Sequence, residues 1–382
     1  MQTVLIFVPN YFPGYMSGGI ARTVLNTVEW LGDEFSFLIV TRDRDLGSDV
    51  PYADVPYGEW VPMGRSRVRY LAPAELGLSA LSELVNDTPH DILHLNSFFD
   101  PVFTIKLLLL MRLGRIRPPR VVMSPRGEFV EGPLRIKYPK KKLYIELSRL
   151  AGFYSPDMRW HASSPHEAQG IVQAMRLPGE RVRSAIDLPI RDAAALAPEA
   201  PPRPRLRVVF LSRLTREKNL DGALRILQRV RLPMDFDIIG PQEDPVYWSE
   251  CAALLKQLPP HVQARYLGPV APEEVFQRLA GYDVFLFPSH GENYGHVIAE
   301  SIAVGTRVLI SQNTPWRGLA TDGVGWDLDL ADAGAFAAVL DELAGLSPDA
   351  RAAARPAVRQ AAAARLSDPV ALEHNRHLYS TI

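Results

Sequence analysis

The chain has 382 residues, of which 47% are hydrophobic, and its formal net charge is −1 at pH 7. At roughly 100–200 residues per domain, this length predicts two domains, and the apolar content is sufficient for two cores. The near-zero charge excludes a generally basic surface for nucleic acid, so no nucleic-acid partner is expected. The single cysteine, Cys251, excludes a disulfide within the chain and favours a reducing compartment.

Five short apolar runs, separated by stretches with helical spacing, organise the first half of the chain. Runs with little polar alternation are typical of parallel strands that are covered on both faces, and the intervening helices indicate βαβ units. The predicted strands are residues 4–8, 36–40, 91–95, 120–123 and 159–162. No basic segment precedes the first run and no small-residue cleavage site follows it, so it is predicted as a strand rather than a signal peptide.

Gly18 and Gly19 follow the first predicted strand and precede a helix that starts near Ile20. A glycine pair at this place is typical of a loop that approaches phosphate, and an ordinary tight turn is the alternative. The G-x-G-x-x-G spacing is missing, so a dinucleotide cofactor is not expected. His94 and His161 end two later strands, where each could be structural or catalytic.

A basic segment follows the fourth strand. Its cations and apolar residues are Arg135, Lys137, Tyr138, Lys140, Lys141, Lys142, Leu143, Tyr144 and Ile145. Such a mixture can rest on an anionic membrane surface, which would suit a lipid-linked acceptor, and a solvated helix face is the alternative. No uncharged apolar run approaches the roughly 20 residues that a membrane-spanning helix needs, so any membrane contact is expected to be peripheral.

Residues 193–206 are dense in proline, which prevents regular structure and is typical of a semi-rigid linker. We therefore expect a first domain over residues 1–192 and a second over 207–367. The second half repeats the strand-and-helix alternation, with predicted strands at residues 207–211, 236–240, 264–268, 284–288 and 307–311. Both halves are thus predicted to be doubly wound α/β domains, which bind ligands at the carboxyl ends of their strands.

Two loops of the second half carry charged residues at such strand ends. Arg213 and Lys218 follow the strand at 207–211, where they could clamp a diphosphate or form a solvated basic loop. Glu292 lies in a glycine-containing loop after the strand at 284–288, and Glu300 lies in the helix that begins after Gly295. A helix start favours phosphate and a carboxylate binds paired sugar hydroxyls, so this layout fits a nucleotide sugar. The alternative is a helix-capping Glu292 and a solvated Glu300.

Together these motifs resemble the retaining GT-B glycosyltransferases of the family 4 type, the glycosyl transferases group 1. Members carry an E-x7-E segment, an Arg and a Lys after the first strand of the second domain, and a glycine pair near the N-terminus. The matching residues are Gly18, Gly19, Arg213, Lys218, Glu292 and Glu300. The resemblance implies two Rossmann-like domains that face each other across a cleft, with a last helix, about residues 368–382, crossing back to the first domain.

The resemblance also implies roles for these residues. Glu292 would bind hydroxyls of the donor sugar, and Glu300 the ribose hydroxyls. Arg213 and Lys218 would neutralise the departing diphosphate, and Gly19, beside Gly18, would approach the phosphates from the first domain. The donor loop between the two glutamates comprises Asn293, Tyr294, Gly295, His296 and Val297.

Many family members carry a histidine where this chain has Arg126, which cannot titrate. Arg126 is therefore a candidate catalytic residue that would hold a phosphate or an acceptor hydroxyl. The chain is expected to be a metal-independent hexosyltransferase without a cofactor. The D-x-D sequences at 43–45, 235–237 and 327–329 lack His or Cys at ligand spacing, and we interpret them as chance.

The implied donor is a UDP- or GDP-linked sugar, and the implied acceptor is a glycan or polyprenyl-linked glycan used for surface polysaccharide or glycolipid synthesis. The protein is then expected in the cytoplasm, peripheral at the inner face of the cytoplasmic membrane. The alternatives are another GT-B enzyme of the epimerase or phosphorylase type, and a non-catalytic protein that binds nucleotide sugars.

Overall fold

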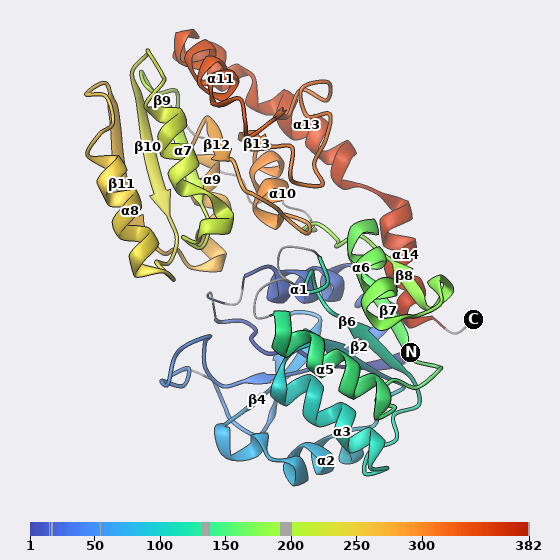
Figure 1. Cartoon of the computed structure of the whole chain (residues 1–382). Helices are drawn as coiled ribbons and strands as arrows, with labels where there is room; N and C mark the ends of the chain where they lie inside the picture. Colours follow the sequence, from blue (N-terminus) through green and yellow to red (C-terminus); the bar gives the residue numbers. More distant parts are fainter. Residues whose placement is uncertain (15, 17, 54, 131–137, 192–200, 381–382) are drawn as a thin grey trace. The chain divides into compact units, whose positions relative to one another are not determined.

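The computed structural model describes residues 1–14, 16, 18–53, 55–130, 138–191 and 201–380. The chain divides into two compact units (Figure 1), which we call unit 1 (Met1–Leu188 and Pro369–Ile382) and unit 2 (Pro189–Asp368). Most of the predicted linker, residues 193–200, lies outside the described residues. The predicted α/β class with two Rossmann-like units is confirmed by their two largely parallel sheets.

Unit 1 contains an eight-stranded sheet in the order β3-β4-β2-β1-β5-β6-β7-β8, parallel except for the antiparallel pair β3–β4. The strands are β1 (Gln2–Phe7), β2 (Phe35–Arg42), β3 (Trp60–Met63), β4 (Ser66–Leu71), β5 (Ile92–Asn96), β6 (Val121–Ser124), β7 (Arg159–Ala162) and β8 (Val182–Ser184). All five strands predicted for this half fall on observed strands. The strands β3, β4 and β8 were not predicted, since β3 and β8 are short strands at the two edges of the sheet and β4 alternates arginine with apolar residues.

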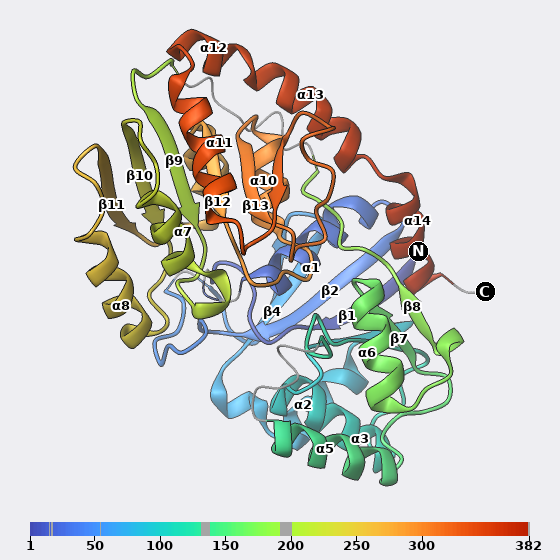
Figure 2. The same ribbon diagram turned by 45° about the horizontal axis from the view of Figure 1, so that its top comes forward.

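Helices cover both faces of this sheet, because successive side chains of a strand point to opposite sides. Leu5 and Phe7 of β1 belong to the core under α2, α3, α5 and α6, whereas Val4 and Ile6 belong to the core under α1 and α14. Figure 2 shows α2, α3 and α5 gathered together. The helices and turns are α1 (Gly19–Leu31), η1 (Pro73–Leu76), α2 (Leu78–Asp87), the π-helical turn η2 (Pro101–Lys106), α3 (Leu107–Arg112), α5 (Tyr138–Leu150), α6 (Pro165–Met175), η3 (Gly179–Arg181) and α14 (Pro369–Tyr379).

Unit 2 contains a parallel six-stranded sheet in the order β11-β10-β9-β12-β13-β14. The strands are β9 (Leu206–Leu211), β10 (Met234–Ile239), β11 (Val262–Gly268), β12 (Val284–Phe287), β13 (Arg307–Ser311) and β14 (Gly325–Leu328). The chain runs outward from β9 to β11 and then returns to β12 on the other side of β9. The strand order therefore reverses between β9 and β12, which is where doubly wound sheets bind their ligands.

The helices and turns of unit 2 are η5 (Arg216–Lys218), α7 (Leu220–Leu227), α8 (Pro245–Leu255), η6 (Pro272–Glu274), α9 (Val275–Ala280), α10 (His296–Ala303), α11 (Ala333–Gly345), α12 (Pro348–Ala353) and α13 (Arg355–Leu366). One apolar core joins α7, α8, α9, α10, α11 and α13 to the sheet. Throughout the part of the chain that the structure describes, no helix combines the length and the apolar character that crossing a membrane requires.

Candidate functional site

The loops after β9 and β12 are tied together at the switch point of unit 2. The backbone N–H of His290 donates to the carbonyl of Glu217 at 2.8 Å. Asn219, in the left-handed conformation with φ 61°, donates its side-chain amide to the carbonyl of Pro288 at 2.7 Å, and its side-chain oxygen caps the start of α7. These contacts fix the two loops against each other, so the side chains between them have defined positions.

Lys218 and Glu292 meet between these two loops. The Nζ of Lys218 lies 2.6 Å from Oε1 of Glu292, and the two side chains are only 13% and 11% exposed. The hydroxyl of Ser289 donates to the same carboxylate oxygen at 3.0 Å. The structure therefore brings together two predicted site residues, and the side chains form one charge-assisted hydrogen-bonded pair.

Glu292 lies against the start of α10. Gly295 caps this helix with φ 85°, a conformation that side chains rarely adopt. A Cβ at Gly295 would lie 2.8 Å from Cδ1 of Ile298 and 3.6 Å from Cγ of Glu292. His296 is the first helical residue, and Glu300, the fifth, is buried. The helix start presents backbone N–H groups beside Glu292, an arrangement that can bind phosphate.

Trp316 donates a hydrogen bond to the loop that precedes α10. Its Nε1 donates to the carbonyl of Tyr294 at 2.6 Å, and the indole is 6% exposed in the core of unit 2. The rings of Tyr294 and His296 are 4.8 Å apart. The burial of Trp316 places it in the core of unit 2.

Arg213 pairs with a different carboxylate from the one that holds Lys218. Its Nη1 lies 3.2 Å from Glu243, in the loop after β10, which is the neighbour of β9 opposite to β12. The two cations predicted to clamp one diphosphate are thus held by carboxylates on the two sides of β9. Glu243 carries no local sequence signal, because its partner lies 30 positions earlier in the chain.

The glycine pair of unit 1 opens α1. Gly18 precedes the helix with φ 63°, and Gly19 is its first residue. The hydroxyl of Thr23, one turn into α1, lies 3.0 Å from the carbonyl of Gly19 and 2.9 Å from Oδ2 of Asp187. Asp187 therefore braces the first turn of this helix.

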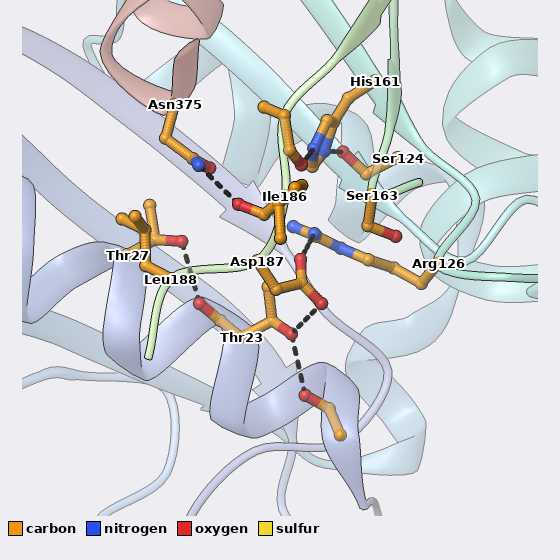
Figure 3. Close-up of polar contacts among 12 residues, drawn as sticks. Thr23, Thr27, Ser124, Arg126, His161, Ser163, Ile186, Asp187, Leu188 and Asn375 are labelled. Carbon is orange, nitrogen blue, oxygen red and sulfur yellow. Dashed lines mark hydrogen bonds and ion pairs between the residues drawn. The ribbon is translucent and has the colours of Figure 1, made fainter. Parts of the chain in front are cut away.

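Asp187 also pairs with Arg126, as Figure 3 shows. The guanidinium donates to Oδ1 of Asp187 at 3.1 Å and to Oδ1 of Asn96 at 2.9 Å, and the two charged side chains are 5% and 6% exposed. Burial raises the pKa of Asp187, whereas the charge of Arg126 lowers it. Asp187 carries no sequence signal, because it stands alone in "SAIDLP" and its partner is 61 positions away.

The buried carboxylate of Glu167 and the partly buried carboxylate of Glu128 shape the loop around Arg126. Glu167 accepts from the backbone N–H of Gly127 and from the hydroxyl of Ser163. Glu128 accepts from the hydroxyl of Ser97 at 2.7 Å, and burial raises its pKa to about 7. Arg126 itself has φ 59°, so these contacts stabilise a backbone conformation that side chains disfavour.

A chain of hydrogen bonds links His94 and His161 through unit 1. Burial lowers the pKa of both rings, to about 3 for His161, so both are neutral near pH 7. Nε2 of His161 contacts the carbonyl of Ala185 at 2.8 Å and must donate to it, so Nδ1 accepts from the hydroxyl of Ser124 at 2.8 Å. It follows that Nε2 of His94 donates to Ser124 at 2.7 Å and that the hydroxyl of Tyr379 donates to Nδ1 of His94 at 3.0 Å. Both nitrogens of each ring are engaged, which favours the structural role.

Among the described residues, no three or more His, Cys, Asp or Glu side chains are grouped so that they could hold a metal ion. The three D-x-D sequences accordingly make no such cluster within that part of the chain. The polar residues at the carboxyl edge of unit 2 instead provide cations, carboxylates and a helix start.

The chain was compared with known proteins. Residues 195–360 match the family model of the glycosyl transferases group 1. No curated protein sequence matches the chain. Anabaena HepE in complex with UDP and glucose is 13% identical, with a TM-score of 0.64 and coverage of 99% of this chain and 98% of that one.

Two further solved structures resemble the whole chain. Sucrose-phosphate synthase from Thermosynechococcus elongatus is 16% identical, with a TM-score of 0.67 and coverage of 99% and 98% of the two chains. A variant of S. aureus TarM in complex with fondaparinux, α-GlcNAc-glycerol and UDP is 11% identical, with a TM-score of 0.68 and full coverage of both chains, 100% each. The chain therefore has the GT-B fold of solved glycosyltransferases, and residues 195–360 match the group 1 glycosyl transferases.

Proposed function

We propose that this chain is a retaining glycosyltransferase of the family 4 type, which moves a hexose from a nucleoside-diphosphate sugar to a glycan or lipid-linked glycan. The observation that carries the proposal is the pair of Lys218 and Glu292 beside the glycine-opened start of α10. This arrangement lies within the residues that match the group 1 family model. A UDP-linked donor is the first candidate, since two of the similar structures contain UDP.

The donor would bind along the carboxyl edge of unit 2. Glu292 would accept hydrogen bonds from the sugar hydroxyls, while its ion pair with Lys218 would hold the carboxylate in place. The N–H groups at His296 and Val297 would meet the phosphates, and Glu300 the ribose. Asn293 and Tyr294 would form the wall of the sugar site, supported by Trp316. Each contact uses a group that the fold already orients.

In the proposed reaction the bond from the sugar C1 to the diphosphate oxygen breaks, and a bond from C1 to the acceptor oxygen forms on the same face. The acceptor proton passes to the departing phosphate. Negative charge grows on the diphosphate, so Arg213, Lys218 and the start of α10 would stabilise the transition state. A charged hydrogen bond contributes roughly 1.5–3 kcal/mol, so loss of either cation should slow the reaction about tenfold to more than a hundredfold.

Unit 1 would serve the acceptor and the phosphates. Gly18 and Gly19 open α1, where the backbone can approach a phosphate closely. Arg126 is engaged by Asp187, so we propose that it shapes the acceptor side through this pair. The cations of the proposed mechanism replace a metal ion at the leaving group, and no cofactor is proposed. A lipid-linked acceptor would place the protein at the cytoplasmic face of a membrane.

The test is a thermal-shift panel of UDP-, GDP-, ADP- and TDP-sugars with EDTA present. Binding raises the melting temperature when ligand greatly exceeds its Kd. We expect a shift with one nucleotide that is lost in Glu300→Gln and Lys218→Ala. The matched control is Lys256→Ala, because Lys256 is an exposed cation of the same unit, at the end of α8. No shift with any nucleotide sugar in a folded sample would refute the donor site.

A positive shift leads to a second measurement. Release of sugar from the bound donor, with the anomer assigned by NMR, separates an enzyme from a binding protein and a retaining from an inverting reaction. Binding without turnover in the presence of a glycan or lipid-linked acceptor panel would favour the non-catalytic alternative.

A further inference from the structure

Helix α5 of unit 1 turns a row of leucines toward solvent. Leu143, Leu147 and Leu150 are 61%, 56% and 84% exposed, and their spacing of four and three places them on one helix face. Ile145 and Ser148, on the opposite face, are buried in unit 1. Helix α5 is thus anchored by one face, and its apolar row is left uncovered.

A further exposed leucine directly follows α3, the helix that is tied to the end of α5. The Nε of Arg112, the last residue of α3, donates to the carbonyl of Ala151, directly after α5, at 2.7 Å. The two helices lie side by side in Figures 1 and 2, and Leu113, next to Arg112, is 61% exposed. We call Leu143, Leu147 and Leu150 the leucine ridge. Single exposed leucines are common, whereas a contiguous row marks a surface that interacts.

Positive charge surrounds the leucine ridge. The exposed cations are Lys140 and Lys142 on α5 and Arg112, Arg115 and Arg117 at and after the end of α3. Glu146 is the one acidic residue in the sequence of α5, and its carboxylate lies 3.1 Å from Arg149 and 3.3 Å from Arg176. The charges of α5 are therefore mainly positive, and the single acidic residue of this helix is offset by two arginines.

We propose that the leucine ridge docks on an anionic lipid surface. Leucines on one helix face that are flanked by lysine and arginine are the pattern of a helix lying in the membrane interface, with its apolar side chains among the acyl chains and its cations at the headgroups. Protein–protein interfaces are instead depleted in lysine at their cores. The concentration of cations next to the ridge therefore favours lipid over a protein partner or a second copy.

This inference deepens the proposed function and rests on it only for its purpose, which is to bring the enzyme to a lipid-linked acceptor. Vesicle binding is measured without donor or acceptor. A chain that does not bind vesicles can still bind nucleotide sugars, so that result would refute only the lipid-docking proposal. A chain that binds vesicles but no nucleotide sugar would refute only the donor site.

The experiment is co-sedimentation of the full chain with extruded vesicles of phosphatidylcholine, with and without 30 mol% phosphatidylglycerol, at roughly 0.05 M and 0.5 M salt. We expect binding to the anionic vesicles that weakens at high salt. The triple variant Leu143→Ser, Leu147→Ser, Leu150→Ser should reduce the partition coefficient at least tenfold, and Lys140→Glu with Lys142→Glu should do the same.

The matched control is Leu46→Ser, which removes a leucine that is 51% exposed elsewhere in unit 1 and should bind like the unaltered chain. Circular dichroism melts identify any variant that fails to fold, in which case single Leu150→Ser, at the most exposed position, replaces the triple variant. Anionic-vesicle binding that survives these changes would overturn the proposal. So would a dimer in solution that the same serine substitutions dissociate, because a second copy would then cover the ridge.

Discussion

Replacing Asp187 by Asn should strongly destabilise unit 1. The substitution keeps the size of the side chain but leaves the guanidinium of Arg126, 5% exposed, without its ion-pair partner. Removing one member of a buried ion pair costs roughly 3–5 kcal/mol, because the other charge stays buried. For a unit of about 200 residues, each kcal/mol lowers the melting temperature by roughly 2–4 °C, so we expect a decrease of roughly 6–20 °C.

Scanning calorimetry of the full chain measures this change, because it resolves the transition of unit 1 if the two units melt separately. The control is Glu274→Gln, which breaks the exposed pair of Glu274 with Arg278, whose side chains are 52% and 54% exposed. That change should cost less than about 1 kcal/mol. The double variant Arg126→Met, Asp187→Leu should recover much of the lost stability, since no unpaired charge remains. A melting temperature for Asp187→Asn that lies within about 2 °C of that of the unaltered chain corresponds to about 1 kcal/mol or less and would refute the assigned pair.

Three further predictions address other contacts. The pKa of His161 is lowered to about 3 and that of an unfolded His is 6.5, so between these values the unfolded chain binds more protons and stability falls as pH drops. When the pH falls from 7 to 5.5, the free energy of unfolding of His161→Gln, measured by urea titration, should therefore decrease by roughly 1 kcal/mol less than that of the unaltered chain. Equal decreases would contradict a neutral buried ring. Gly295→Ala places a Cβ against Ile298 at positive φ, so it should destabilise unit 2 by roughly 1–3 kcal/mol. It should also weaken nucleotide-sugar binding in the thermal-shift assay, and unchanged binding would show that the start of α10 is not part of the donor site. Tyr379→Phe leaves Nδ1 of His94 without its donor and should cost roughly 1–3 kcal/mol by calorimetry, whereas an unaltered transition would argue against the hydrogen-bond chain.

The strands that were predicted are short runs rich in apolar residues, each with its own local pattern, and they include β11 at the edge of the unit 2 sheet. All five strands predicted for the second half fall on β9 to β13. β14, with the sequence GWDL, was not predicted because Leu328 is its one aliphatic residue. β4 lies between β3 and β2 and alternates arginine with apolar residues, so its sequence pattern is close to that of a loop.

The residues of the candidate site divide in the same way. Gly295 and the start of α10 follow from a glycine between a strand and a helix, which is a local pattern. The partners Glu243 and Asp187 do not, because their contacts join residues 30 and 61 positions apart. The pairing of Lys218 with Glu292, 74 positions apart, likewise depends on the strand order, which no run of adjacent residues encodes.

The position of α14 sets an order for the folding of this protein during its synthesis. Tyr379 closes the hydrogen-bond chain to His94 and packs in the core of unit 1, but it is translated only after all of unit 2, Pro189–Asp368. At roughly 5–20 residues per second, the ribosome needs about 10–40 s to make those residues. Unit 2 is one continuous stretch and can fold in that time, whereas one face of the unit 1 sheet stays partly uncovered. The unit that is begun first is therefore completed last, and its unfinished face is the part of the nascent chain that a chaperone would meet.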